Sequence, residues 1–385
     1  MDFTFTEEQE LAAQALRGLL DDHCTGADLR RAAEARSAEA FAAACAVRRE
    51  RLKELGLAGV LVPDAAGGLG LAPIDVARLA EEAGRAALPE PLIDAEGVAL
   101  PMLAKLAGAA GAAGTAGAAA ARQALDAVLA QDATVLAVAP GSGPVAGVAD
   151  ADYLLVGRSP DELALHRRNA LRVTPVDSVD PLRRLAAVEV ADGVPLAVLQ
   201  GPAARAAWEA AGARHAAFIA AQQLGLGARM IAIAVAYALD RKQFGKAIGA
   251  NQAVKHALAD AQMRVEFARP VIYTACAALD PIAPPDAAAA LRVSHAFVAA
   301  ADAADRAARA AIQVHGAMGY SWEVDLQFYA KRAWALAALA GGRSAHFGRL
   351  HRALLDGGLA TGPDHLFDAG SASSRVAAAS GAAPA

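Results

Sequence analysis

Two strings of polar residues and glycines in the second half of the chain could bind a ligand. The first, DRKQFGKAIGANQAVKHALAD, spans residues 240–260, and the second, QVHGAMGYSWEVDLQFYAKR, spans residues 313–332. Arg241 carries a guanidinium fork that suits phosphate oxygens, and a compact ammonium could not repeat that bidentate contact. Gly316 allows the backbone to approach a ligand closely. Taken alone, Arg241 is better explained as an ordinary surface cation that follows a helix, and only the whole motif favours a ligand contact.

Helices must position both strings, and helical signals begin near the N-terminus. Thr6 followed by Gln9 predicts a capped helix start with acidic residues in the first turn. Further helices are expected at about residues 38–55 and 74–84. Between them, the proline and glycines of residues 55–71 predict an ordered turn region.

A small β region interrupts the helices. Between residues 133 and 200, short β-branched or leucine-rich runs are separated by Gly, Pro and Asp, which is typical of strands and turns. The Ala/Gly-rich residues 107–122 could be a linker or a weak helix. We predict a mainly α fold with a small β domain. The expected units are an N-terminal helical domain (1–125), a small middle β domain (126–202), a C-terminal helical bundle (203–356) and a disordered tail (357–385).

Composition excludes several classes of function. A net charge of −5 without a Lys/Arg-rich block gives no reason to expect nucleic acid or a membrane as a partner. The three cysteines are far apart and show no CxxC spacing, so neither a disulfide scaffold nor a metal site is expected. The acidic N-terminus lacks the basic region of a signal peptide, and a cytoplasmic location is expected.

The order of elements and the two strings resemble the acyl-CoA dehydrogenase family. The N-terminal TEEQ and the VPDAAGGLGL turn look like the same family, and the resemblance covers roughly residues 1–356. It implies an N-terminal helical domain, a middle β domain and a C-terminal four-helix bundle that assemble into tetramers. It also implies FAD as the cofactor and α,β-dehydrogenation of an acyl-CoA thioester, with a glutamate as the base.

In this family the FAD crosses a subunit interface, and its pyrophosphate and adenosine extend into the neighbouring protomer. Arg241 matches the arginine that meets the pyrophosphate. The other matching cofactor-binding residues are Gln243, Phe244, Asn251, Gln252, Gln313, Val314, His315, Gly316 and Ala317. Gln313 and His315 could instead satisfy buried backbone groups.

In this family each protomer also supplies residues that contact the flavin ring of its own FAD. The motifs that carry these residues are not recognisable in this chain. Family members carry a TEPxxGSD-like loop and a WITN-like strand end there, whereas this chain reads AVAPGSGPVAGVADADYLLV. No tryptophan occurs before residue 208. Ser142 could donate a hydrogen bond to flavin, although a bare turn is the better explanation for it.

The catalytic glutamate is also missing. Motif counting places the family's base positions at Ala340, His215 and Gln222, none of which is a carboxylate. Alanine cannot accept a proton, and glutamine keeps the shape of glutamate without its basicity. Only His215 could titrate near neutral pH, and a lone histidine on an Ala-rich helix can also be structural.

Three hypotheses follow from this pattern. In the first, the chain is a subunit of a heterotetrameric acyl-CoA dehydrogenase that acts on steroid or other lipid-derived acyl groups. A homologous partner then carries the base, and an electron-transferring flavoprotein could accept the electrons. In the second, the chain is a self-sufficient homotetrameric flavoenzyme with His215, or an acid such as Glu209, as base. In the third, it is a non-enzymatic scaffold.

Overall fold

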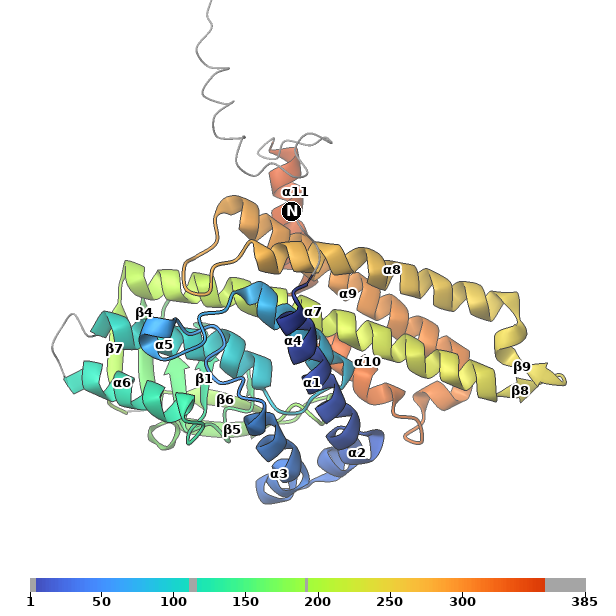
Figure 1. Ribbon diagram of the computed structural model, residues 1–385, viewed down its shortest axis with the longest axis horizontal. Helices are drawn as coiled ribbons and strands as arrows, with labels where there is room; N and C mark the ends of the chain where they lie inside the picture. The colour runs from blue at the N-terminus through green and yellow to red at the C-terminus, as the bar shows by residue number, and fades with distance from the viewer. Residues whose placement is uncertain (1–4, 111–115, 191–192, 357–385) are drawn as a thin grey trace, which may run out of the picture.

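The computed structural model describes residues 5–110, 116–190 and 193–356, and it confirms the mainly helical class with a small β unit (Figure 1). Thr6 caps the first helix as predicted: its hydroxyl accepts the Gln9 amide N–H, and the Gln9 side chain accepts the Thr6 N–H at 2.8 Å. The N-terminal α-helices are α1 (Glu7–His23), α2 (Gly26–Glu34), α3 (Ala38–Glu54), α4 (Pro73–Arg85), α5 (Leu100–Ala110) and α6 (Ala116–Leu129).

Two short helices of other types occur among these α-helices. The turn region predicted at residues 55–71 contains the 3₁₀-helix η1 (Asp64–Ala66), and the π-helix η2 (Asp94–Ala99) was not predicted. Arg214, which is buried in the C-terminal bundle, donates to the carbonyls of Gly97 and Val98 at 3.0 and 3.3 Å. A guanidinium therefore ties the π-helix to the bundle. The Ala/Gly-rich stretch 107–122 is helical wherever the structure describes it.

The β unit consists of two small sheets. One has the strand order β1-β3-β4-β7, in which β1 and β3 are parallel, and the other has the antiparallel order β2-β6-β5. Apolar residues such as Leu136, Leu154 and Val148 form a second core, separate from the main one. The strands are β1 (Val135–Val138), β2 (Val145–Ala146), β3 (Tyr153–Val156), β4 (Glu162–Arg167), β5 (Arg172–Val176), β6 (Leu185–Glu189) and β7 (Ala197–Gln200).

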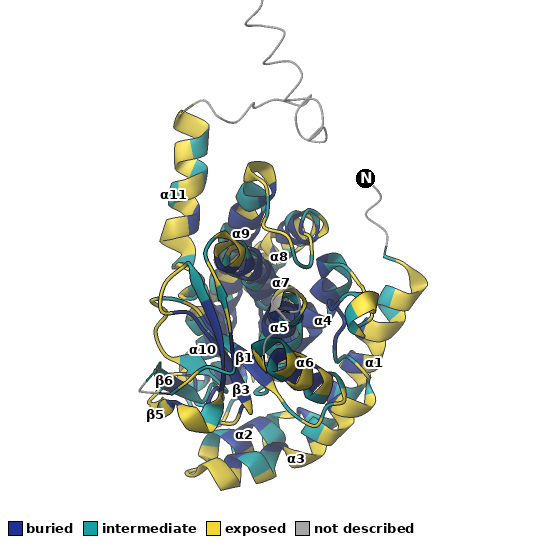
Figure 2. Ribbon diagram, turned by 90° about the vertical axis from the view of Figure 1, so that its left-hand side faces the viewer, coloured by how far each residue is buried: buried dark blue, intermediate teal, exposed yellow. Residues whose placement is uncertain are grey.

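Long helices form the C-terminal bundle, in which α7 is packed against α4, α8 and α9. Figure 2 shows buried residues gathered where these helices meet, whereas α11 projects from the body. Leu258, Ala261 and Val265 recur at helical spacing and are buried, so they form the apolar face of α8. The helices are α7 (Pro202–Asp240), α8 (Gln252–Ala277), α9 (Ala287–His315), α10 (Leu326–Ala337) and α11 (Gly342–Leu355).

Glycines allow α4 and α7 to meet backbone to backbone. A Cβ atom added to Gly84 would overlap the carbonyl of Gln222, and one added to Gly225 would overlap the carbonyl of Glu81. Among the described helices, α7 alone is long and apolar enough to cross a membrane, and 67% of its apolar window is buried inside the protein. Burial of that kind is expected for the central helix of a bundle. The predicted tail at 357–385 lies outside the described residues.

Candidate functional site

A tight hairpin forms the start of the first string, which was predicted to bind a ligand. Arg241 ends α7, and β8 (Lys242–Gln243) pairs with β9 (Lys246–Ala247) around a turn formed by Phe244 and Gly245. Both turn residues have positive φ, 51° and 78°, as a two-residue hairpin of this kind requires. The Phe244 side chain is 100% exposed, and Arg241 and Gln243 are exposed beside it. The hairpin therefore presents an aromatic ring and a guanidinium outward.

The second string lies at the end of α9 and in the 3₁₀-helix η6 (Gly316–Tyr320). Gln313, Gly316 and Ala317 are exposed, and Gly316 has a φ of 59° where α9 ends. His315 is buried, and its Nδ1 lies 2.7 Å from the Ala311 carbonyl oxygen. The structure therefore uses the His315 ring to satisfy buried backbone, one of the two roles considered for it.

Aromatic stacking brings the two strings together. The His315 ring stacks on Tyr237 at a centroid distance of 4.2 Å, and Tyr237 lies one turn before Arg241 on α7. Later in the first string, Asn251 occupies the N-cap position of α8 without a side-chain cap hydrogen bond, and Gln252 begins the helix. Asn251 is half-buried and Gln252 is exposed. The ends of α7 and α9 and the start of α8 thus present most of the predicted cofactor residues, with Val314 half-buried among them.

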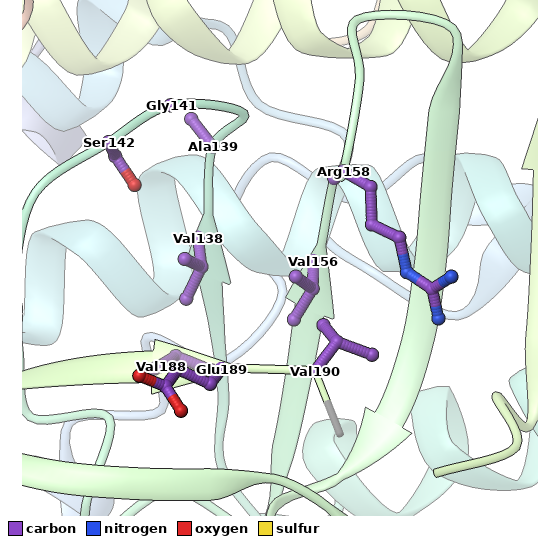
Figure 3. Close-up of a pocket in the computed structure, with 10 residues that line it drawn as sticks. Val138, Ala139, Gly141, Ser142, Val156, Arg158, Val188, Glu189 and Val190 are labelled. Carbon is purple, nitrogen blue, oxygen red and sulfur yellow. The ribbon is translucent and has the colours of Figure 1, made fainter. Parts of the chain in front are cut away.

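The β unit offers a different kind of site. Figure 3 shows Val138, Val156, Val188 and Val190 lining a pocket, with Ser142 in the loop after β1. The Ser142 amide donates to the Ala139 carbonyl at 3.0 Å, as in a simple turn.

The three positions predicted for the base lie in two different parts of the fold. Ala340 lies between α10 and α11 with a φ of 52°, and its carbonyl oxygen is 3.1 Å from Nε2 of His346. His215 and Gln222 both lie on α7, and Gln222 lines a small cavity between the N-terminal helices, the β unit and α10. The remaining charged or polar residues that line this cavity are Glu90, Asp94, Arg183 and Arg332.

Two residues near this cavity were not identified from the sequence. Asp94 of η2 lies within ion-pair distance of His215, with Oδ1 3.2 Å from Nε2. Arg332 of α10 pairs with buried Asp180 and donates to the Leu88 carbonyl at 2.8 Å. Arg332 is the last residue of the second string, whereas Asp94 belongs to no recognisable local motif, and in both cases only the folded chain identifies the partner.

This fold, with helices, a small β unit and a second set of helices, is that of the acyl-CoA dehydrogenase class of oxidoreductases. Residues 6–112 match the acyl-CoA dehydrogenase N-terminal domain, and residues 206–355 match the acyl-CoA dehydrogenase C-terminal domain. The chain belongs to the acyl-CoA dehydrogenase family.

Curated relatives agree with this assignment. The acyl-CoA dehydrogenase IpdE2 of Mycobacterium tuberculosis is 33% identical, over 74% of this chain and 80% of the relative. The protein of the same name from Mycolicibacterium smegmatis is 30% identical, over 87% and 95%.

Solved structures resemble the chain over nearly its whole length. A variant of the steroid ACAD Tcur3481-Tcur3483 superposes with a TM-score of 0.73 at 26% identity, covering 91% of this chain and 99% of the other. Butyryl-CoA dehydrogenase from Megasphaera elsdenii gives a TM-score of 0.75 at 18% identity, covering 92% and 100%. At that lower identity the similarity concerns the fold alone.

Proposed function

We propose that the chain is a subunit of an FAD-dependent acyl-CoA dehydrogenase that supplies the pyrophosphate and adenosine contacts to the FAD of a neighbouring subunit. The observation that carries this proposal is the outward hairpin, where Arg241 and Phe244 are exposed rather than used within the chain. An exposed guanidinium suits a phosphate that arrives from another subunit. The backbone at Gly316, which is exposed and close to the hairpin, suits the same ligand.

The residues of the hairpin fit the cofactor better than those of the β unit do. When FAD is bound, it supplies the acceptor for the hydride that leaves the acyl group. Arg241 would hold the pyrophosphate, and Phe244 would cover part of the ligand from water. The loop at Ser142 is a short turn and offers little to a flavin ring. The proposed assembly is therefore a heterotetramer in which a homologous partner has the complete ring site.

A steroid or other lipid-derived acyl-CoA is the proposed substrate class. This rests on the similarity to the steroid ACAD Tcur3481-Tcur3483. An electron-transferring flavoprotein is the proposed electron acceptor. None of Ala340, His215 and Gln222 is a carboxylate, so the glutamate-based step belongs to the partner in this assembly.

The decisive experiment measures native mass and FAD content of the chain alone and after co-expression with a homologous partner. We expect a flavin-poor chain alone and a complex with about one FAD per two chains. Arg241→Ala in the complex should weaken FAD binding about tenfold or more, because a charge-assisted bidentate contact is lost. Lys242→Ala, which removes the adjacent exposed cation, is the matched control and should change FAD binding little.

Two other outcomes would contradict the proposal. A lone chain that forms a yellow homotetramer with one FAD per chain would refute the partner-subunit proposal. Absence of FAD from every purified complex would instead favour the scaffold hypothesis.

A further inference from the structure

Two buried polar atoms belong to residues that line the small cavity beside Gln222. They are Oε1 of Glu90 and Nη2 of Arg332, and neither has a hydrogen-bond partner among the residues that the structure describes. The two side chains are only 7% and 6% exposed. A polar group that is buried without a partner is costly, and such groups in folded proteins are commonly bonded to an ordered water.

The other polar atoms of both side chains are already paired. Oε2 of Glu90 accepts from Nε of Arg48 at 2.7 Å. Arg332 pairs with Asp180 through Nε, and through Nη1 it donates to the Leu88 carbonyl at 2.8 Å. These contacts hold the two side chains in place and leave one acceptor and one donor at the same cavity.

The backbone next to Glu90 cannot supply the missing donor. Pro89 and Pro91 flank it, and proline has no backbone N–H. The fixed φ of the two prolines also makes this segment stiff. Both prolines line the cavity, so the wall around Glu90 is rigid and offers its carboxylate no backbone N–H from either neighbour.

The size and the charge of the cavity decide which ligand it can hold. Its volume is about 30 Å³. One water molecule needs roughly 10–15 Å³, whereas pockets for organic ligands measure about 300 Å³ or more. The charges of the lining residues balance, because Glu90 and Asp94 are opposed by Arg183 and Arg332. A small neutral ligand with both a donor and an acceptor is therefore favoured over an ion.

We propose that this cavity is a binding site for one ordered water molecule, which accepts a hydrogen bond from Nη2 of Arg332 and donates one to Oε1 of Glu90. The amide of Gln222, which can donate and accept, provides the third contact that a buried water typically makes. A bridging water is nearly as favourable in enthalpy as a direct hydrogen bond. The site therefore satisfies both buried atoms at once.

The water joins two ion pairs that draw on all three parts of the chain. Arg48 lies on α3 among the N-terminal helices, Arg332 lies on α10 of the bundle, and Asp180 lies in the loop between β5 and β6. A continuous path of polar contacts then runs from Arg48 through Glu90 and the water to Arg332 and Asp180. This inference does not rest on the proposed function, because it involves neither FAD nor a partner chain.

A crystal structure of the full chain tests the site directly. We expect density for a water oxygen about 3 Å from both Oε1 of Glu90 and Nη2 of Arg332. A second crystal soaked in bromide distinguishes a water from an anion, because bromide at the same position would give an anomalous signal. No bromide is expected there.

Relaxation dispersion of water ¹⁷O tests the site in solution, because it counts the water molecules that a protein holds for long times. Ala146→Leu enlarges a residue that lines the cavity and should remove one long-lived water. Its melting temperature should also be lower than that of Ala149→Leu, since Glu90 and Arg332 lose their bridge. Ala149→Leu is the matched control: Ala149 is a half-buried alanine of the same β unit outside the lining of the cavity, and its replacement should keep the wild-type count.

Four results would overturn the inference. The first is a wild-type crystal structure with no density in the cavity, and the second is bromide bound there. The third is an Arg183 guanidinium that fills the cavity and donates to Glu90. The fourth is a wild-type count of long-lived waters in Ala146→Leu when its own crystal structure shows leucine in the cavity.

Discussion

At the scale of single residues, a buried histidine holds the turn at Ala340, which motif counting predicted to be a base position of the family. Ala340 has a positive φ, followed by Gly341 and Gly342 with φ of 89° and 72°. The turn is held by His346, which contacts the Ala340 carbonyl through Nε2 and Ser294 through Nδ1 at 3.2 Å. The His346 ring is buried and stacks on Phe297. The His346 imidazole therefore fixes the segment in which motif counting placed one of the family's base positions.

Protonation of His346 should destabilise the chain. Burial, and then the positive charge of Arg349, lower the pKa of His346 from 6.5 to about 4. Because the folded state resists protonation, stability is complete above about pH 6.5 and falls as pH decreases toward 4, by about 3 kcal/mol at most. Urea unfolding across this range should show that loss, and His346→Gln should reduce it.

The matched control for this measurement is His351→Gln. His351 is exposed on the same helix, so its replacement should leave the pH dependence as it is in the wild type. If the unfolding free energy of His346→Gln falls between pH 6.5 and 4 as steeply as that of the wild type, another group causes the acid sensitivity.

At the scale of elements, the close contact of α4 and α7 sets the shape of the cavity region. Gly84 and Gly225 lie where the two backbones touch, and Gln222 between them lines the cavity. Helices with larger residues at these points would stand further apart. The small side chains of α7 therefore determine how near the N-terminal helices approach the bundle.

Gly225→Ala should separate the two helices. Its Cβ would meet the backbone carbonyl of Glu81, which cannot rotate away, so we expect a loss of about 3 kcal/mol or more in unfolding free energy. Gly212→Ala on the same helix meets nothing within 4 Å and should be neutral or stabilising by up to about 1 kcal/mol. Chemical denaturation gives the unfolding free energy of both variants. Equal unfolding free energies for Gly225→Ala and Gly212→Ala would contradict the explanation by close backbone contact.

At the scale of the whole molecule, one buried ion pair connects three parts of the chain. Arg332 comes from α10, Asp180 from the loop between β5 and β6, and the Leu88 carbonyl from the segment after α4. Asp180 is fully buried, and it also accepts the Leu182 amide at 3.0 Å. Since the pair has little access to water, the packing of the β unit against the helices depends on it.

A double-mutant cycle should show strong coupling between Arg332 and Asp180. Arg332→Met leaves a buried carboxylate uncompensated and should cost about 3–5 kcal/mol, whereas Arg332→Met with Asp180→Asn should cost clearly less. The exposed pair Arg205–Asp161 is the control, and its coupling should lie below about 1 kcal/mol. Additive losses for Arg332 and Asp180 would contradict this role of the pair.

The sequence predicted best those features that depend on residues close together in the chain. The cap at Thr6 depends on neighbours three residues apart, and the apolar face of α8 depends on helical spacing, so both could be predicted. The mainly α class followed from helical patterns along the chain, and the family followed from two strings of residues that are each continuous in the sequence. The π-helix η2 was missed, because its sequence differs little from that of an ordinary helix.

Tertiary structure alone decided which side chains meet. Asp94 is far from His215 in the sequence, and Asp180 is far from Arg332, so no spacing rule could pair them. The contact of Tyr237 with His315, which brings the two predicted ligand-binding strings together, likewise exists only once α7 and α9 pack. The sequence by itself determined the elements, their order and the family, because these depend on neighbouring residues and on continuous motifs. Packing determined the environment of each candidate site residue, because burial and charge pairing depend on residues from several elements at once.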